Sequence, residues 1–81
     1  MPGEVHIGEI IRRQLAQRKL TGTWLAEKMS LDRTTIYKIF RKKSIDSDLL
    51  LRISLAVGYD FFEIYDNCYN NQVQSSNHNQ D

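Results

Sequence analysis

The stretch LAEKMSLDRTTIYKI, residues 25–39, contains two short apolar repeats at helical spacing with a break between them. The apolar positions are Leu25, Ala26 and Met29 before the break, then Ile36, Ile39 and Phe40 after it. The break, residues 30–32, ends in Asp32, a residue type that caps helices by accepting from the amides that follow, here those of Thr34 or Thr35. The pattern therefore predicts two short helices joined by a turn.

Three further helices follow from the same periodicity on either side of this stretch. The first ends near Lys19, and its apolar face consists of Ile7, Ile10, Ile11 and Leu15. The fourth begins after the cap residue Asp46 and ends at Gly58, because glycine tolerates the left-handed conformation that closes many helices. Its inward residues are Leu49, Leu50, Ile53, Ala56 and Val57. The fifth opens at Asp60, which has capping-box spacing to Glu63, and offers Phe61, Ile64 and Tyr65 to the core.

Thr21 is the predicted cap of the second helix, which precedes the break. No segment shows the sustained alternation of apolar and polar residues that is typical of a strand. We therefore predict an all-α fold with five compactly packed helices.

The chain has 81 residues, which suits one small domain. From Asn67 onward Asn, Gln and Ser dominate and no basic residue appears, a composition typical of disorder. The sequence predicts a domain over residues 4–66 and a polar, disordered tail over residues 67–81.

Several classes of protein are disfavoured by composition. No apolar run is long enough for a membrane span, and no signal-like segment precedes the domain, so we expect a cytoplasmic protein. The lone Cys68 has only His6 and His78 as distant companions, which is not metal-ligand spacing. We expect no metal, no cofactor and no catalytic residues, and therefore no enzyme.

The charge is strongly divided along the chain although the net charge is only +1. Residues 12–43 carry ten basic and two acidic side chains, a net charge of +8. Residues 44–66 carry one basic and five acidic side chains, a net charge of −4. This division favours one face that binds a polyanion, against the alternative of an ordinary solvated surface.

The two helices around residues 30–32 have the spacing of a helix-turn-helix, a motif whose second helix enters the major groove of DNA. Only the outward residues near the start of that helix reach base edges. The predicted base contacts are Arg33, Thr34, Tyr37 and Lys38. The predicted phosphate contacts are Lys19, Thr23, Trp24, Arg41, Lys42 and Lys43.

Residues 25–39, followed by residues 50–53 (LLRI) and 56–58 (AVG), resemble the lambda-repressor-like helix-turn-helix family of the Cro/repressor and xenobiotic-response-element type. The resemblance covers roughly residues 7–65. It implies a five-helix DNA-binding domain, usually dimeric on a roughly palindromic operator, that acts as a transcriptional regulator.

The resemblance also assigns roles to individual positions. It implies that Arg33, Thr34 and Lys38 read bases, and that residues 41–42 approach the DNA backbone. The chain departs from the family at Gly22, where many members place a glutamine that contacts phosphate. Either that contact is missing here or another side chain supplies it.

Five of the eight aromatic residues fall between positions 59 and 69, and one short helix cannot turn all of them inward. Exposed aromatics favour association, so we expect a two-fold homodimer built on the fifth helix. The predicted interface residues are Phe61, Phe62, Tyr65 and Tyr69. The alternative is that these aromatics simply complete the core.

The sequence leaves two functions open. The first is a sequence-specific DNA-binding regulator that acts as a dimeric repressor by occluding a promoter. The second is a protein-interaction module, antitoxin-like or regulator-binding, that uses the aromatic C-terminal surface. The acidic fourth helix favours the second, and the basic segment 12–43 favours the first.

Overall fold

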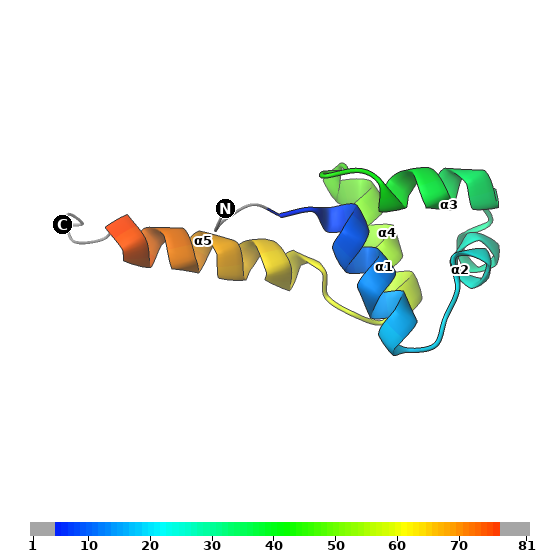
Figure 1. The fold of residues 1–81 in the computed structure, drawn as a ribbon, viewed down its shortest axis with the longest axis horizontal. Helices are drawn as coiled ribbons and strands as arrows, with labels where there is room; N and C mark the ends of the chain where they lie inside the picture. The colour runs from blue at the N-terminus through cyan, green and yellow to red at the C-terminus, as the bar shows by residue number, and fades with distance from the viewer. Residues whose placement is uncertain (1–4, 77–81) are drawn as a thin grey trace.

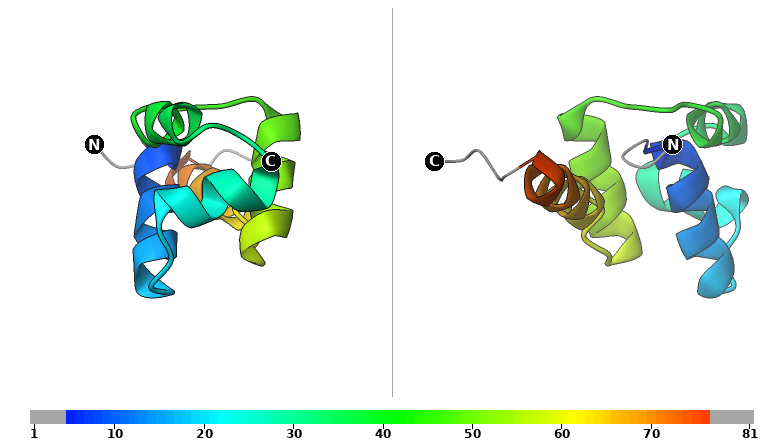
Figure 2. Two further views of the ribbon diagram at one scale, coloured as in Figure 1. Left: turned by 90° about the vertical axis from the view of Figure 1, so that its right-hand side faces the viewer. Right: turned by 60° about the vertical axis from the view of Figure 1, so that its left-hand side comes forward.

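Five helices make up the part of the chain that the computed structural model describes, residues 5–76. They are α1 (Ile7–Gln17), α2 (Gly22–Met29), α3 (Arg33–Phe40), α4 (Ser47–Val57) and α5 (Phe62–Ser76). Helices α1 to α4 pack together, and α5 projects away from them (Figure 1). The views in Figure 2 show the same arrangement from two other sides. The predicted all-helical fold is confirmed for these residues.

Local capping chemistry sets most of the helix ends. The Thr21 hydroxyl accepts from the amide of Trp24 at 3.0 Å, and the Asp46 carboxylate accepts from the amide of Leu49 at 2.7 Å. Gly58 closes α4 in the left-handed conformation, with φ of 83°. These three predicted caps are confirmed. His6, which the sequence did not single out, caps α1 by accepting from the amide of Glu9.

The prediction for Asp32 is only half correct. Asp32 does precede α3, but its carboxylate makes no capping hydrogen bond to the helix. The side chain is exposed, and its φ and ψ of −74° and 148° are those of an extended residue. Water can satisfy the amides at this end of α3, so nothing requires the carboxylate to turn toward them.

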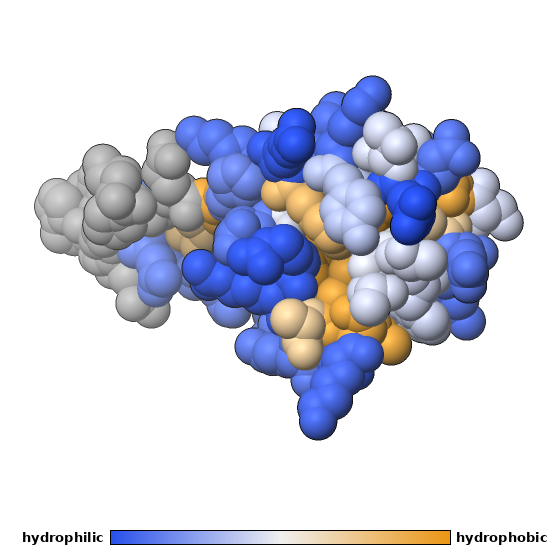
Figure 3. All heavy atoms as spheres, turned by 45° about the vertical axis from the view of Figure 1, so that its right-hand side comes forward, coloured by the Kyte–Doolittle hydropathy of each residue, from blue (hydrophilic) through white to orange (hydrophobic). Residues whose placement is uncertain are grey.

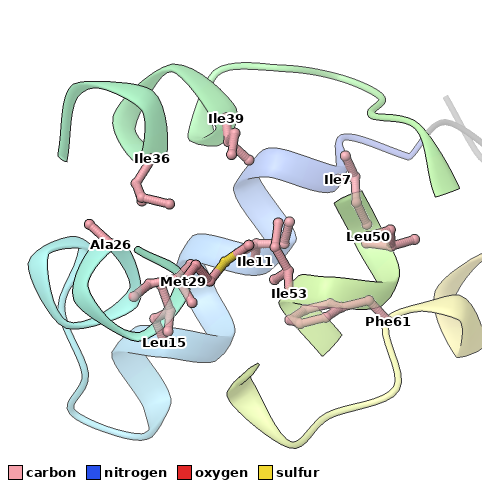
Figure 4. Close-up of a cluster of buried hydrophobic side chains, with 11 residues drawn as sticks. Ile7, Ile11, Leu15, Ala26, Met29, Ile36, Ile39, Leu50, Ile53 and Phe61 are labelled. Atoms are coloured by element: carbon pink, nitrogen blue, oxygen red, sulfur yellow. The ribbon is translucent and has the colours of Figure 1, made fainter. Parts of the chain in front are cut away.

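The core lies among α1 to α4 and includes one residue from the segment that precedes α5 (Figure 4). Its fully buried large side chains are Ile7, Ile11, Leu15, Leu25, Ile36, Ile53 and Phe61. Phe61 was also predicted to lie in a dimer interface, and this is wrong because its side chain is 0% exposed. Its amide donates to the buried Ser54 hydroxyl at 3.3 Å, which fixes the turn between α4 and α5.

Helix α1 approaches the end of α3 more closely than a side chain at position 8 would permit. A Cβ on Gly8 would lie 2.5 Å from the carbonyl oxygen of Phe40, and closer still to that of Ile39. The amides of Ile7 and Gly8 donate to the carbonyls of Lys43 and Lys42 at 3.0 and 2.9 Å. The first turn of α1 thus anchors the chain that leaves α3. The amide groups of that turn have no partner within the helix and donate to these carbonyls instead.

Helix α5 is longer than the sequence predicted. It continues through Ser76, so residues 67–76, which were expected to form a disordered tail, are helical. A segment with few apolar residues cannot build a hydrophobic core, but it can still form a helix, since Gln is a good helix former. Gln72 and Cys68 pair along the helix at i, i+4 spacing, 3.4 Å apart. Residues 77–81 and residue 4 lie outside the described residues.

Candidate nucleic-acid interface

One side of α3 is buried and the other is open to solvent. Ile36 and Ile39 are 0% and 3% exposed, which anchors the helix on the core. The four predicted base-contacting residues all lie on the exposed side; they are Arg33, Thr34, Tyr37 and Lys38. Thr35 is exposed as well. Helix α5 leaves the bundle on the side away from α3, so it does not cover this surface (Figure 1).

The turn between α2 and α3 fixes the angle at which α3 is presented. Ser30 adopts the left-handed conformation with φ of 59°, and the amide of Leu31 donates to the carbonyl of Ala26 at 2.8 Å. This bond pattern closes the end of α2, while the half-buried Leu31 packs against the core. Figure 1 shows α2 nearly end-on where α3 lies across the view, so the two helices cross steeply.

Tyr37 is held in place by its neighbours although its side chain is 47% exposed. Its ring meets the ring of Phe40 edge to face, with centroids 5.6 Å apart. A Cβ on Gly22 would lie 3.0 Å from the Tyr37 ring, so the absence of a side chain at position 22 makes room for it. Glycine at position 22, where many members of the resembled family have glutamine, therefore leaves room for the Tyr37 ring, which lies over the start of α2.

The predicted phosphate-contacting residues lie in the turn before α2, in α2 itself and directly after α3. Lys19, Arg41, Lys42 and Lys43 are exposed, whereas Thr23 and Trp24 are half-buried. The Lys28 ammonium lies 6.0 Å from the centre of the Trp24 ring, which adds a cation that the sequence reasoning did not select. Hydrophilic side chains cover most of the upper edge of the molecule, where α3 lies (Figure 3).

Two other arginines of the basic segment are already paired. The Glu9 carboxylate lies 2.5 Å from the Arg12 guanidinium and 3.6 Å from that of Arg13. The hydrogen bond from Arg12 lowers the pKa of Glu9 below its usual value and raises the pKa of Arg12. Their charge is partly offset at the surface of α1, so we place neither arginine among the strongest phosphate candidates.

Three residues with structural or surface roles were missed by the sequence reasoning. Gly8 was not selected because its role depends on the approach of a distant part of the chain. Leu51 and Leu55 were not selected because they lie off the inward face of α4, and both are exposed. The signal for these two was available in the sequence, since an i, i+4 leucine pair on an outward face is unusual.

Comparisons of the chain with protein-family models, with curated proteins and with solved structures find no match. Among residues 5–76 no helix combines the length and apolar character needed to cross a bilayer. The same residues hold no group of three or more His, Cys, Asp and Glu side chains that could bind a metal ion.

Proposed function

We propose that this protein is a sequence-specific, double-stranded DNA-binding regulator that inserts α3 into the major groove. In this proposal α2, the turn and α3 act as a helix-turn-helix of the lambda-repressor-like type. The observation that carries it is the two-sided character of α3: the apolar side is buried, and Arg33, Thr34 and Lys38 are exposed on the other side. By occupying an operator, the protein would act as a repressor.

The side chains on α3 suit the reading of base pairs. An arginine can donate two hydrogen bonds to the O6 and N7 atoms of guanine, and a threonine can contact a base edge or the methyl group of thymine. Arg33 and Thr34 lie in the first turn of α3, the part of a recognition helix that enters a groove most deeply. The fixed Tyr37 ring then limits how the helix can sit against the sugar and phosphate edge.

The cations beside α3 would provide affinity without sequence preference. Lysine and arginine contacts to phosphate fix the orientation of a protein on the duplex, while base contacts supply the choice of sequence. Residues 41–43 follow α3 directly, and Lys19 lies in the turn before α2. Along the sequence the two groups lie on either side of the helix pair formed by α2 and α3.

Replacing Arg33 with alanine is expected to weaken binding to the preferred site by about 1–3 kcal/mol and to change binding to random duplex very little. The preferred site is obtained first by selection from a randomised duplex pool, and affinity is then measured by fluorescence anisotropy. Arg12→Ala is the matched control, because Arg12 lies on α1 and its guanidinium is paired with Glu9. Equal losses on the selected and random duplexes would contradict a base-reading role for Arg33.

Binding is also expected to depend steeply on salt. If about four to six phosphates are neutralised per dimer, the slope of log K against log salt concentration is about −4 to −5. Gel shifts with random DNA at a series of salt concentrations measure this slope. Absence of any salt-dependent retardation would count against DNA binding and favour the second candidate.

That second candidate is a protein-interaction module. The observation that favours it is the exposure of aromatic side chains on α5, where Tyr69 is 66% exposed. Such a module would keep its fold and show no affinity for random DNA at low salt. The salt series therefore separates the two candidates.

A further inference from the structure

The segment between α3 and α4, residues 41–46, combines a cluster of cations with an exposed serine. Arg41, Lys42 and Lys43 directly precede Ser44, and all four side chains are exposed. None of residues 41–46 belongs to a helix. The segment crosses the molecule along the same edge as α3 (Figure 2). A hydroxyl group therefore lies beside three of the cations that we expect to contact phosphate.

Neither the hydroxyl nor the backbone of Ser44 has a partner in the folded chain. Within the described residues the Ser44 hydroxyl makes no hydrogen bond, and the amides and carbonyls of Ser44 and Ile45 pair with no other backbone group. The preceding residues are anchored, because the carbonyls of residues 42 and 43 accept from the first turn of α1 at 2.9 and 3.0 Å. Ile45 anchors the other side by packing against the core. The chain thus holds Ser44 at a fixed place and leaves its polar groups available.

Thr21 provides a comparison within the same chain, because it also follows basic residues, Arg18 and Lys19. Its hydroxyl accepts from the amide of Trp24, and its carbonyl accepts from the amide of Leu25. The Arg18 guanidinium is engaged as well, since it donates within α1 and lies 5.2 Å from the centre of an aromatic ring. The two hydroxyl groups have similar charged neighbours in the sequence, but only that of Ser44 is free.

A free hydroxyl that follows three cations suits phosphoryl transfer by a kinase with an acidic substrate cleft. Carboxylates in such a cleft attract the cations, and the unpaired backbone groups of the substrate can bond to the enzyme. The hydroxyl oxygen attacks the γ-phosphorus of ATP, and the bond from that phosphorus to the β-phosphate oxygen breaks, so that ADP leaves. The hydroxyl proton passes to a carboxylate of the kinase.

We propose that Ser44 is a phosphorylation site for a serine/threonine protein kinase that recognises the cations at positions 41–43, and that its phosphate releases the protein from DNA. A phosphoserine carries a charge of about −1.5 to −2 at pH 7. It would offset more than half of the +3 charge of residues 41–43. The choice of Ser44 is independent of DNA binding, whereas the release from DNA rests on the proposed function.

The phosphate group would weaken DNA binding in two ways. Its oxygens accept charge-assisted hydrogen bonds from neighbouring lysines, which are then no longer available to the duplex. Its negative charge also repels the phosphates of the DNA backbone. If residues 41–43 neutralise one or two phosphates per subunit, their loss flattens the slope of log K against log salt by about 1–2 per subunit.

Incubation of the full chain with Mg·ATP and the catalytic subunit of cyclic-AMP-dependent protein kinase, whose substrate cleft is acidic, tests the site. Mass spectrometry is expected to find about one phosphate per chain on Ser44 and none on Thr21. Ser44→Ala should abolish the modification. Because Ser44 is exposed and makes no hydrogen bond, this variant should keep the helical circular dichroism of the wild type.

A pair of double variants tests whether the cations direct the kinase. R41Q/K42Q is expected to slow phosphorylation about tenfold, because it removes two of the three charges that precede the serine. R12Q/R13Q removes the same charge from exposed positions of α1 and is the matched control. It should leave the rate within about twofold of wild type.

The effect on DNA is measured with phosphoserine placed at position 44 during translation by an expanded genetic code, so that it does not depend on any kinase. Affinity for random duplex is expected to fall at least about tenfold, with a flatter salt dependence. The matched control places phosphoserine at position 16 in place of alanine, an exposed position near the end of α1 that lies away from α3 (Figure 1). This control should bind within about threefold of the unmodified chain.

A chain that takes up no phosphate, or takes it up on Thr21, overturns the assignment of Ser44. So does a Ser44→Ala variant that is labelled as fast as wild type. An unmodified chain that binds DNA no better than the chain with phosphoserine at position 44 overturns the release from DNA. If the unmodified chain shows no DNA binding at all, the proposed function fails and the release fails with it, while the kinase assay still decides the site.

Discussion

Replacing Phe61 with alanine is expected to lower the free energy of unfolding by about 3–5 kcal/mol, the range for removing a large buried aromatic side chain. Phe61 is fully buried among residues of α1 and α4, and its ring also contacts that of Tyr59 edge to face, 4.8 Å between centroids. A domain of this length has a total stability of about 4–10 kcal/mol. The variant should therefore lose between about a third of its stability and all of it.

Urea unfolding followed by circular dichroism at one fixed protein concentration measures this loss. The neighbouring substitution Phe62→Ala is the control, because that side chain is 37% exposed. It should cost about 1–2 kcal/mol at a concentration where the protein is monomeric. Equal losses from the two variants would contradict the placement of Phe61 in the core.

Replacing Gly8 with alanine is the second change with a large expected effect. Two contributions of opposite sign to the free energy of unfolding compete at this position. Helix propensity alone predicts a gain of about 0.5–1 kcal/mol, since alanine is the better helix former. The new Cβ would, however, collide with the carbonyl oxygens of Ile39 and Phe40, which are backbone atoms and cannot rotate away. We expect a net loss of about 2–3 kcal/mol from overpacking.

The same unfolding experiment gives this value, and Ala16→Gly on the exposed side of α1 provides the matched comparison. That change should lose about 0.5–1 kcal/mol through helix propensity alone. If Gly8→Ala instead stabilises the protein, α1 and α3 do not approach as closely as described. Because Gly8 lies against the end of α3, the variant should also weaken the proposed DNA binding when it is folded.

The helix ends were predictable where one side chain acts on its own neighbours. Thr21, Asp46 and Gly58 each perform a function within three or four residues of their own position. The apolar positions of α1 were also predictable, because Ile7, Ile11 and Leu15 repeat at the helical period. Such features depend on local geometry alone.

Predictions failed where the outcome depended on the direction of the chain after a turn. Phe61 and Phe62 are adjacent aromatics, and the left-handed turn at Gly58 decides which of them faces inward. The hydrogen bond from the Phe61 amide to the buried Ser54 hydroxyl holds Phe61 inward, so of the two places that the sequence offered this residue, the core and the dimer interface, only the core is correct. The sequence therefore assigned to the dimer interface a residue whose side chain lies in the core.

Features that join distant segments were not predictable either. The role of Gly8 arises from residues more than thirty positions later, and the space for the Tyr37 ring arises from Gly22 on another helix. Of the proposed site, the exposure of Arg33, Thr34 and Lys38 followed from the apolar repeat of α3.

The hydrogen bonds from Ile7 and Gly8 to the carbonyls of Lys43 and Lys42 have a practical consequence for how the protein is prepared. They bring the start of α1 beside residues 41–43, so a fluorescent label attached at the start of α1 would lie next to the lysines that we expect to touch DNA. The far end of α5 lies at the opposite extreme of the molecule (Figure 1). Labels for DNA-binding assays therefore belong near the far end of α5.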